Sequence, residues 1–416
     1  MFLLFLSFML GLSLLLPWNS LLKSMPYIMT RVPEEWKDSA PLWLTLTFTM
    51  TNCVVLTLLT LSDADSRLIR KLTGWRETEK VVGGRLYGGL MGCAGLLGLA
   101  CVGPLMDIFG KSVDEESMST LILFWGIFIC TGWLMCLLQR SVYPLMALIP
   151  GKKDLMVPAM LTGQAVAGIA ASMGSFLFAG EGKGGAVMAL AYFGCSILAL
   201  LVTAVLYSRY ASTADVVAES ESNKVIEEQP KFSIKILYET AKIIRPWPQL
   251  LSFNFAATLA VFPGLLTSSA RSLAGNKFFI PMTFLVFDAF DLIGKVMPSV
   301  VSRGLGPKSK IAMGFPLMRV LFIPAFLILP NFGMVESGLT GDWWYFSVLA
   351  MMAWTSGWGN AICLINGPLS AQNQNKETVT VSEETGDRIG SLMGLSITFG
   401  LLCGSGVSFL IKKLIN

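Results

Sequence analysis

The sequence predicts an all-α polytopic membrane protein, and two observations carry that prediction. The first is composition: of 416 residues, 54% are hydrophobic and 14% are charged, and the mean hydropathy is +0.64. A soluble domain carries about 25% charged residues, so this chain has little over half of the expected charge. The second is that the apolar residues come in blocks of about 20, the length of a helix that spans a hydrocarbon core about 30 Å thick. These blocks exclude a chain of two or three soluble domains.

The blocks predict about eleven spanning helices, with ends placed to within a few residues. They lie at 1–25, 41–61, 81–106, 119–138, 155–179, 186–208, 246–269, 278–300, 311–330, 343–366 and 388–411. The first block opens without a basic segment and lacks a small-residue cleavage site. We therefore expect it to be retained as a span and not removed as a signal peptide.

One long polar connection divides the predicted spans into six and five. We expect a six-helix bundle at 1–208, a cytoplasmic linker at 209–245 and a five-helix bundle at 246–416. After Pro230, apolar residues recur at helical spacing among lysines, which fits either a helix lying in the membrane interface or a plain linker. Two bundles joined by a flexible loop suit alternating access around a central site.

The basic residues predict the orientation. The even-numbered connections hold about 19 Lys and Arg, against about 9 in the odd-numbered connections and the C-terminal tail. Because cytoplasmic loops carry the excess of basic residues, we expect a cytoplasmic N-terminus and a C-terminus on the outside.

Several classes of chemistry are disfavoured by what the chain lacks. It contains no histidine, so Ser-His and Cys-His nucleophile pairs, histidine zinc sites and imidazole proton relays are excluded. Its eight cysteines lie in apolar blocks without a CxxC pair, and we interpret them as small hydrophobic residues. We expect no metal and no cofactor. The net charge of +4 is too small to indicate nucleic-acid binding.

Four charged residues inside the spans are the first candidates for a site. Asp288, Asp291 and Lys295 lie in the eighth predicted span and Arg319 in the ninth. Inserting each such residue costs about 2.5–3.5 kcal/mol, so each is a functional candidate. The spacing puts the first three on one helix face, where Asp291 can pair with Lys295, and Arg319 is the expected partner of the remaining carboxylate. The cluster is either a permeation site or a buried ion-pair lock without substrate contact.

A second candidate region lies in the first span. Pro17 frees a backbone carbonyl there, and Trp18 and Asn19 follow at once. A flat indole and a two-sided amide edge suit a planar heterocycle, although Trp18 is also a candidate interfacial anchor. Gln139, at the end of the fourth predicted span, either contacts a base edge or caps its helix.

The motifs, taken in order, resemble those of the equilibrative nucleoside transporter family. The matching segments lie at 11–19, 138–141, 158–168, 262–263, 287–295, 319–324, 355–368 and 384–386. The resemblance spans nearly the whole chain. It implies a major-facilitator-like fold of eleven helices and passive or proton-coupled passage of nucleosides or nucleobases.

The resemblance also implies roles for individual residues. Leu15 and Trp18 would pack on the base, and Gln139 would hydrogen-bond it. Asp291 and Lys295 would lie near the ribose.

The same family match gives Phe262 the role of helping to close the cavity. Gly163 and Gly168 we interpret as packing positions that allow helices to approach closely. Two other functions are weighed against transport: a non-transporting nucleoside receptor, and an intramembrane aspartyl enzyme using Asp288 and Asp291. The enzyme is disfavoured because both acids lie on one helix.

Three positions depart from the family pattern. Asp288 replaces the usual Asn, Lys295 replaces Arg and loses the bidentate fork, and Met135 replaces a glycine and narrows the wall near Gln139. We expect Asp288 to couple uptake to protons, because burial favours the neutral form of a carboxylate. We further expect a monomer without an N-glycan, in the plasma membrane or, alternatively, in an internal membrane.

Overall fold

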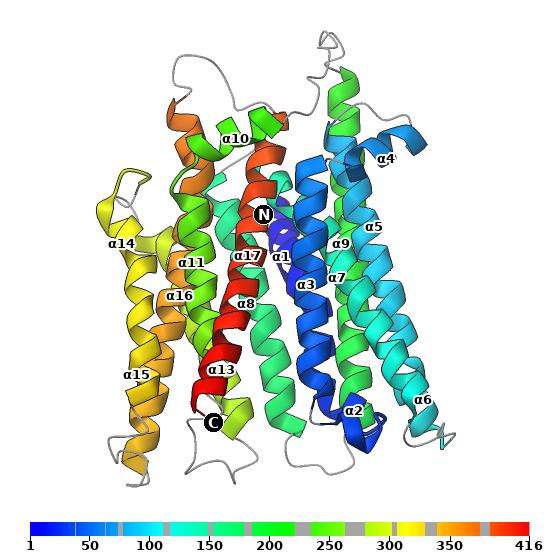
Figure 1. Cartoon of the computed structure of the whole chain (residues 1–416). Helices are drawn as coiled ribbons and strands as arrows, with labels where there is room; N and C mark the ends of the chain where they lie inside the picture. Colours follow the sequence, from blue (N-terminus) through cyan, green and yellow to red (C-terminus); the bar gives the residue numbers. More distant parts are fainter. Residues whose placement is uncertain are drawn as a thin grey trace.

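The computed structural model confirms the all-α prediction. It describes residues 1–37, 39–62, 64–73, 78–110, 117–148, 153–178, 185–220, 234–262, 279–301, 306–328, 339–374 and 383–415, where every regular element is a helix. The long helices lie side by side along one common direction (Figure 1). Eight helices of this described part are long and apolar enough to cross a membrane. The chain is therefore an integral membrane protein.

Helices α1 to α9 form what we call the amino-terminal half. They are α1 (Phe2–Lys23), α2 (Met25–Met29), the 3₁₀ turn η1 (Glu34–Trp36), α3 (Ala40–Ser62), α4 (Ala64–Thr73), α5 (Thr78–Ala100), α6 (Val102–Ile108), α7 (Met118–Leu148), α8 (Lys153–Phe178) and α9 (Gly185–Ser220).

Helices α10 to α17 form the carboxy-terminal half. They are α10 (Ile234–Ile243), α11 (Trp247–Val261), α13 (Phe279–Val301), α14 (Lys310–Met318), the 3₁₀ turn η2 (Arg319–Leu321), α15 (Phe322–Ile328), α16 (Leu339–Gln374) and α17 (Glu383–Ile415). The eight apolar spans include α16 and α17 but not α11, α13 or α15, which run alongside them (Figure 1). The number eleven therefore stays a prediction.

Helices α7, α9, α16 and α17 are longer than predicted, and the first two change how the sequence was interpreted. α7 continues to Leu148, so Gln139 lies in its interior and does not cap it. α9 continues to Ser220, so the expected linker is helical over 209–220, where neither Gly nor Pro interrupts the chain. α10 covers part of the segment for which an interfacial helix was weighed.

Proline residues end or interrupt two other predicted spans. α11 stops at Val261, and Phe262 is extended (φ −104°, ψ 134°), because a residue that precedes proline avoids the helical region. The rest of that span, 263–269, lies outside the described residues. The ninth span consists of α14, η2 and α15 and is not one regular helix.

The described even-numbered connections lie at one end of the bundle and the odd-numbered ones at the other, as the predicted orientation requires. α4 and α10, from the second and sixth connections, lie at one end of the bundle (Figure 1). α2, α6 and the C-terminus lie at the other end (Figure 1). Which of these ends faces the cytoplasm stays a prediction.

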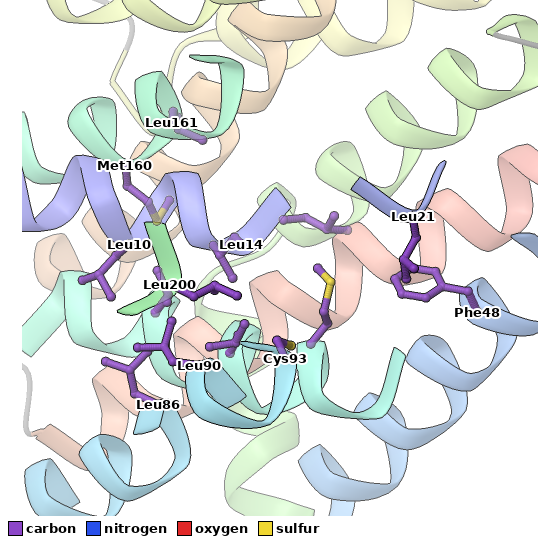
Figure 2. Close-up of a cluster of buried hydrophobic side chains, with 14 of the residues drawn as sticks. Leu10, Leu14, Leu21, Phe48, Leu86, Leu90, Cys93, Met160, Leu161 and Leu200 are labelled. Atoms are coloured by element: carbon purple, nitrogen blue, oxygen red, sulfur yellow. The ribbon is translucent and has the colours of Figure 1, made fainter. Parts of the chain in front are cut away.

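The core of the amino-terminal half is built by side chains from many helices. Leu10 of α1, Leu86 and Leu90 of α5 and Leu200 of α9 are fully buried, and Met160 of α8 is 1% exposed. Figure 2 shows these side chains converging from separate helices. This packing fixes α1 against its neighbours and so positions the polar residues that α1 carries.

Glycines allow two helix pairs to touch backbone to backbone. On α1 and α8, a Cβ at Gly11 or Gly163 would lie within 3.0 Å of a carbonyl oxygen on the other helix. The same holds for Gly294 of α13 and Gly357 of α16. Real Cβ atoms do not approach this closely, so a larger residue forces the helices apart.

We predict that Gly357→Ala destabilises the protein by about 1–3 kcal/mol, the usual effect of overpacking. The added methyl group would overlap the backbone of Asp291 on α13. The matched control is Gly95→Ala, since nothing lies within 4 Å of a Cβ there and alanine favours the helix. Thermal unfolding of both variants in detergent checks this, and equal melting temperatures would refute the close-contact argument.

Candidate functional site

An ion pair lies at the centre of α13. Lys295 Nζ is 2.6 Å from Asp291 Oδ2, one helical turn away, and the two residues are only 5% and 9% exposed. The pairing predicted from their spacing is therefore confirmed. The glycine-mediated contact with α16 holds this part of α13 rigidly in place.

Arg319 does not pair directly with a carboxylate in the described structure, contrary to expectation. It is 1% exposed and donates to neutral oxygens: the backbone carbonyl and the side chain of Asn254 (the latter at 2.9 Å), Thr258 Oγ1 (2.7 Å) and the Met352 carbonyl (3.4 Å). Asp291 attracts it only through longer-range electrostatics. The guanidinium thus joins η2 to α11 and α16. Sequence spacing could not identify acceptors that lie on other helices.

Asp288 lies where the two halves meet. Its carboxylate is half-buried and accepts a hydrogen bond from Ser172 Oγ of α8. A Cβ at Gly168, also on α8, would lie 2.8 Å from Asp288 Oδ1. The missing side chain at Gly168 therefore leaves room for the carboxylate of the opposite half.

Lys23 is a charged residue of this region that sequence reasoning missed. It is half-buried at the end of α1, and its Nζ lies 3.6 Å from the centroid of the Phe284 ring on α13. It also attracts Asp288 electrostatically. Its place at the end of the first apolar block of the sequence could have identified Lys23 as a candidate. Its ammonium group links α1 to α13 across the two halves.

Aromatic rings form a wall beside these charges. Phe262 stacks on Phe287 at 4.2 Å with an interplanar angle of 13°, and it meets Phe284 edge to face at 4.9 Å and 72°. Because Phe284 also carries Lys23 on its face, the rings and the ammonium group form one continuous cluster. Aromatic faces and charged groups therefore lie together in this region.

The predicted base-binding residues of α1 have partners on other helices. Trp18 stacks on Phe48 of α3 at 4.1 Å and meets Phe128 of α7 edge to face at 6.4 Å. One face of the indole is therefore already covered by protein. Leu15 and Asn19 are half-buried next to it along the helix.

Gln139 joins the two halves from the interior of α7. Its side-chain oxygen accepts a hydrogen bond of 3.3 Å from Thr398 of α17. Met135, one turn earlier, is 3% exposed and packs in the main hydrophobic core, to which both halves contribute side chains. A ligand that accepts or donates a hydrogen bond at Gln139 would therefore have to share the side chain with Thr398 of the other half or displace Thr398.

A second ion-pair network was not predicted. Arg85 of α5 pairs with Asp387 of α17 at 2.8 Å and with Asp65 of α4 at 3.5 Å. Arg140 of α7 binds Asp65 at 2.5 Å. Arg85 is only 1% exposed. Its position inside the predicted span 81–106 could have marked it as a candidate for such an ion pair. This network ties the two halves together on the side of the molecule where α4 lies.

Among the described residues, no group of three or more Cys, Asp or Glu side chains could hold a metal ion. The described side chains of the region offer ionic attraction, hydrogen bonding and aromatic stacking.

Comparison with known proteins gives a consistent result. A family model described as "Nucleoside transporter" matches residues 214–413. Over 98% of the chain, the sequence is 23% identical to human equilibrative nucleoside transporter 1 and to human equilibrative nucleoside transporter 2, in each case covering 96% of the relative. Nucleoside transporter 1.2 of Leishmania donovani matches 39% of the chain at 25% identity.

Solved structures support the fold. A bacterial homologue of the iron transporter ferroportin, crystallised in an outward-facing state, superposes with a TM-score of 0.59 over 98% of this chain and 92% of its own. The sequences are 15% identical, so the likeness concerns the fold alone. It agrees with the predicted major-facilitator-like arrangement.

Proposed function

We propose that the chain, which is similar to the equilibrative nucleoside transporters over 98% of its length, moves nucleosides or nucleobases across a membrane by alternating access. The observation that carries the proposal is the position of the motif residues. Phe262, just after the end of α11, stacks on α13, which carries Asp288, Asp291 and Lys295. Asp288 also touches α8 of the other half. A substrate bound there would contact both halves.

Each side chain has a proposed part in binding. The Asp291–Lys295 pair offers an acceptor and a donor for sugar hydroxyls, and Phe262 covers the site from the end of α11. Trp18 supplies an aromatic surface for the base, with Leu15 and Asn19 beside it. Gly163 and Gly168 keep α8 close to its neighbours, and Gln139 offers its amide to the base edge.

The contacts between the halves suit a carrier with two gates. Arg85 and Asp387 join them through one ion pair, and Ser172 and Asp288 join them through a hydrogen bond. We propose that the bundles at 1–208 and 246–416 separate at one of these places while they stay closed at the other. Substrate would then reach the site from one side of the membrane at a time.

The relatives are transporters, so the prediction that the chain is not an enzyme is confirmed. The arrangement of the acids agrees with this. Asp291 is occupied by Lys295, and Asp288 lies on the same helix, so the two do not form a dyad on facing helices.

Location and assembly are also proposed. We place the protein in the plasma membrane as a monomer. Surface biotinylation of intact cells and the mass of the detergent-solubilised protein by light scattering would test these two points.

Uptake into proteoliposomes tests the function. Purified protein should take up labelled adenosine, uridine or a free nucleobase saturably, with competition by the unlabelled compound, whereas protein-free liposomes should not. Binding of nucleosides without net flux would instead identify a receptor. Absence of both binding and flux over the whole panel would reject the proposal.

A further inference from the structure

Helix α4 lies across the end of the bundle, whereas the long helices run along it (Figure 1). It spans ten residues, Ala64–Thr73, and follows directly after the second span. A helix in this position lies at the level of lipid headgroups if α3 and α5 cross the bilayer. Its outer surface can therefore meet lipid directly.

The surface of α4 has an apolar stripe beside a basic one. Leu68 is 56% exposed and Leu72 is 75% exposed, and residues four apart share one helix face. Arg67 and Lys71, also exposed and four apart, share the neighbouring face. Apolar residues beside basic ones are typical of a helix that lies in the membrane interface.

Within α4 itself, the exposed charged residues are all basic. Asp65 is the single acidic residue of α4, and it is turned inward, with 7% exposure. Arg67 is held in place by a 2.8 Å hydrogen bond from its guanidinium to the carbonyl of Ser62, and four further N–H donors of a guanidinium remain for other acceptors. This surface complements the negative phosphate of an anionic lipid headgroup.

The inner side of α4 is connected to the contact between the halves. Asp65 binds Arg140 of α7 at 2.5 Å and Arg85 of α5 at 3.5 Å. Arg85 in turn binds Asp387 of α17 at 2.8 Å. Whatever fixes the position of α4 therefore also fixes the carboxylate that organises this network.

We propose that α4 is a binding site for anionic phospholipid headgroups, with Arg67 and Lys71 on the phosphate and Leu68 and Leu72 in the acyl region. The bound lipid holds Asp65 in place and so strengthens the ion-pair network that joins the two halves.

Lipid binding by the full-length protein tests the first part. Native mass spectrometry should show that the wild-type protein binds phosphatidylglycerol more tightly than phosphatidylcholine. Arg67→Gln and Lys71→Gln should each weaken phosphatidylglycerol binding about fivefold, the effect of one basic residue at an anionic surface. The matched control is the pair Lys308→Gln and Lys310→Gln, which removes two exposed charges at the start of α14. The site would be overturned if the wild type showed no preference for phosphatidylglycerol. It would also be overturned if K308Q/K310Q lost as much phosphatidylglycerol binding as R67Q/K71Q.

Thermal unfolding in nanodiscs tests the second part, because a ligand of the folded state raises its stability. Adding phosphatidylglycerol to phosphatidylcholine should raise the melting temperature of the wild type but not of the R67Q/K71Q variant. Asp65→Asn should still bind the lipid, but with a smaller rise than the wild type, because the lipid no longer strengthens the ion-pair network through Asp65; Asp387→Asn replaces it if that variant does not fold. A rise as large as that of the wild type in R67Q/K71Q would contradict the lipid site, and one in Asp65→Asn would contradict its coupling to the ion-pair network. An equal rise with inorganic phosphate alone would contradict a lipid ligand.

Discussion

Lys295→Met is expected to destabilise the protein by about 3–5 kcal/mol, because it leaves the buried carboxylate of Asp291 without its partner. The two groups lie 2.6 Å apart with almost no exposure. Thermal unfolding in detergent measures the effect. Lys308→Met, at an exposed position, serves as the control and should leave the melting temperature unchanged.

The double variant Asp291→Asn, Lys295→Met separates stability from function. Replacing both partners of a buried ion pair by neutral groups is often close to neutral for stability, so most of the lost stability should return. Nucleoside uptake should not return, because the carboxylate acceptor and the ammonium donor proposed for the ribose are gone and the remaining amide of Asn is a weaker, uncharged partner. Recovery of uptake together with stability would show that the pair is only a structural lock.

Asp288→Asn is expected to abolish the response of uptake to a pH gradient. If one proton accompanies each substrate, uptake rises when the side from which substrate enters is made more acidic. A difference of one pH unit stores about 1.4 kcal/mol and so supports about tenfold accumulation. Proteoliposomes with imposed pH gradients measure this directly.

Lys23→Met is the companion variant, because Lys23 is the cation that faces Asp288 from α1. Its loss should change the pH at which uptake is half-maximal, whereas Asp288→Asn should make the profile flat. Wild-type uptake that does not respond to pH, or an unchanged gradient response in Asp288→Asn, would remove the coupling hypothesis and leave equilibrative transport.

The spans could be predicted from the sequence because an apolar block of about 20 residues has one stable arrangement in a bilayer. The Asp291–Lys295 pair could be predicted because both groups lie on one helix, where spacing determines contact. The position of Gln139 in the interior of α7 could not be predicted. The helix continues past Pro144, and proline is usually a sign that a helix ends or kinks.

Contacts between helices were beyond sequence reasoning. Lys23 lies near Asp288 only because α1 and α13 come together. Arg319 donates hydrogen bonds to Asn254 and Thr258, two neutral residues of α11, whereas the count of charges had favoured a carboxylate. Interior charges were easy to find, but their partners depend on tertiary packing.

Counterflow tests the central claim of alternating access most directly. Proteoliposomes are loaded with unlabelled nucleoside and diluted into a trace of labelled nucleoside. A carrier that exposes one site to each side in turn releases unlabelled nucleoside outside and returns to the inside with labelled nucleoside. The concentration of label inside the liposomes should therefore rise transiently above the concentration outside before it falls. Label that only approaches the outside concentration, without an overshoot, would contradict alternating access and indicate a pore.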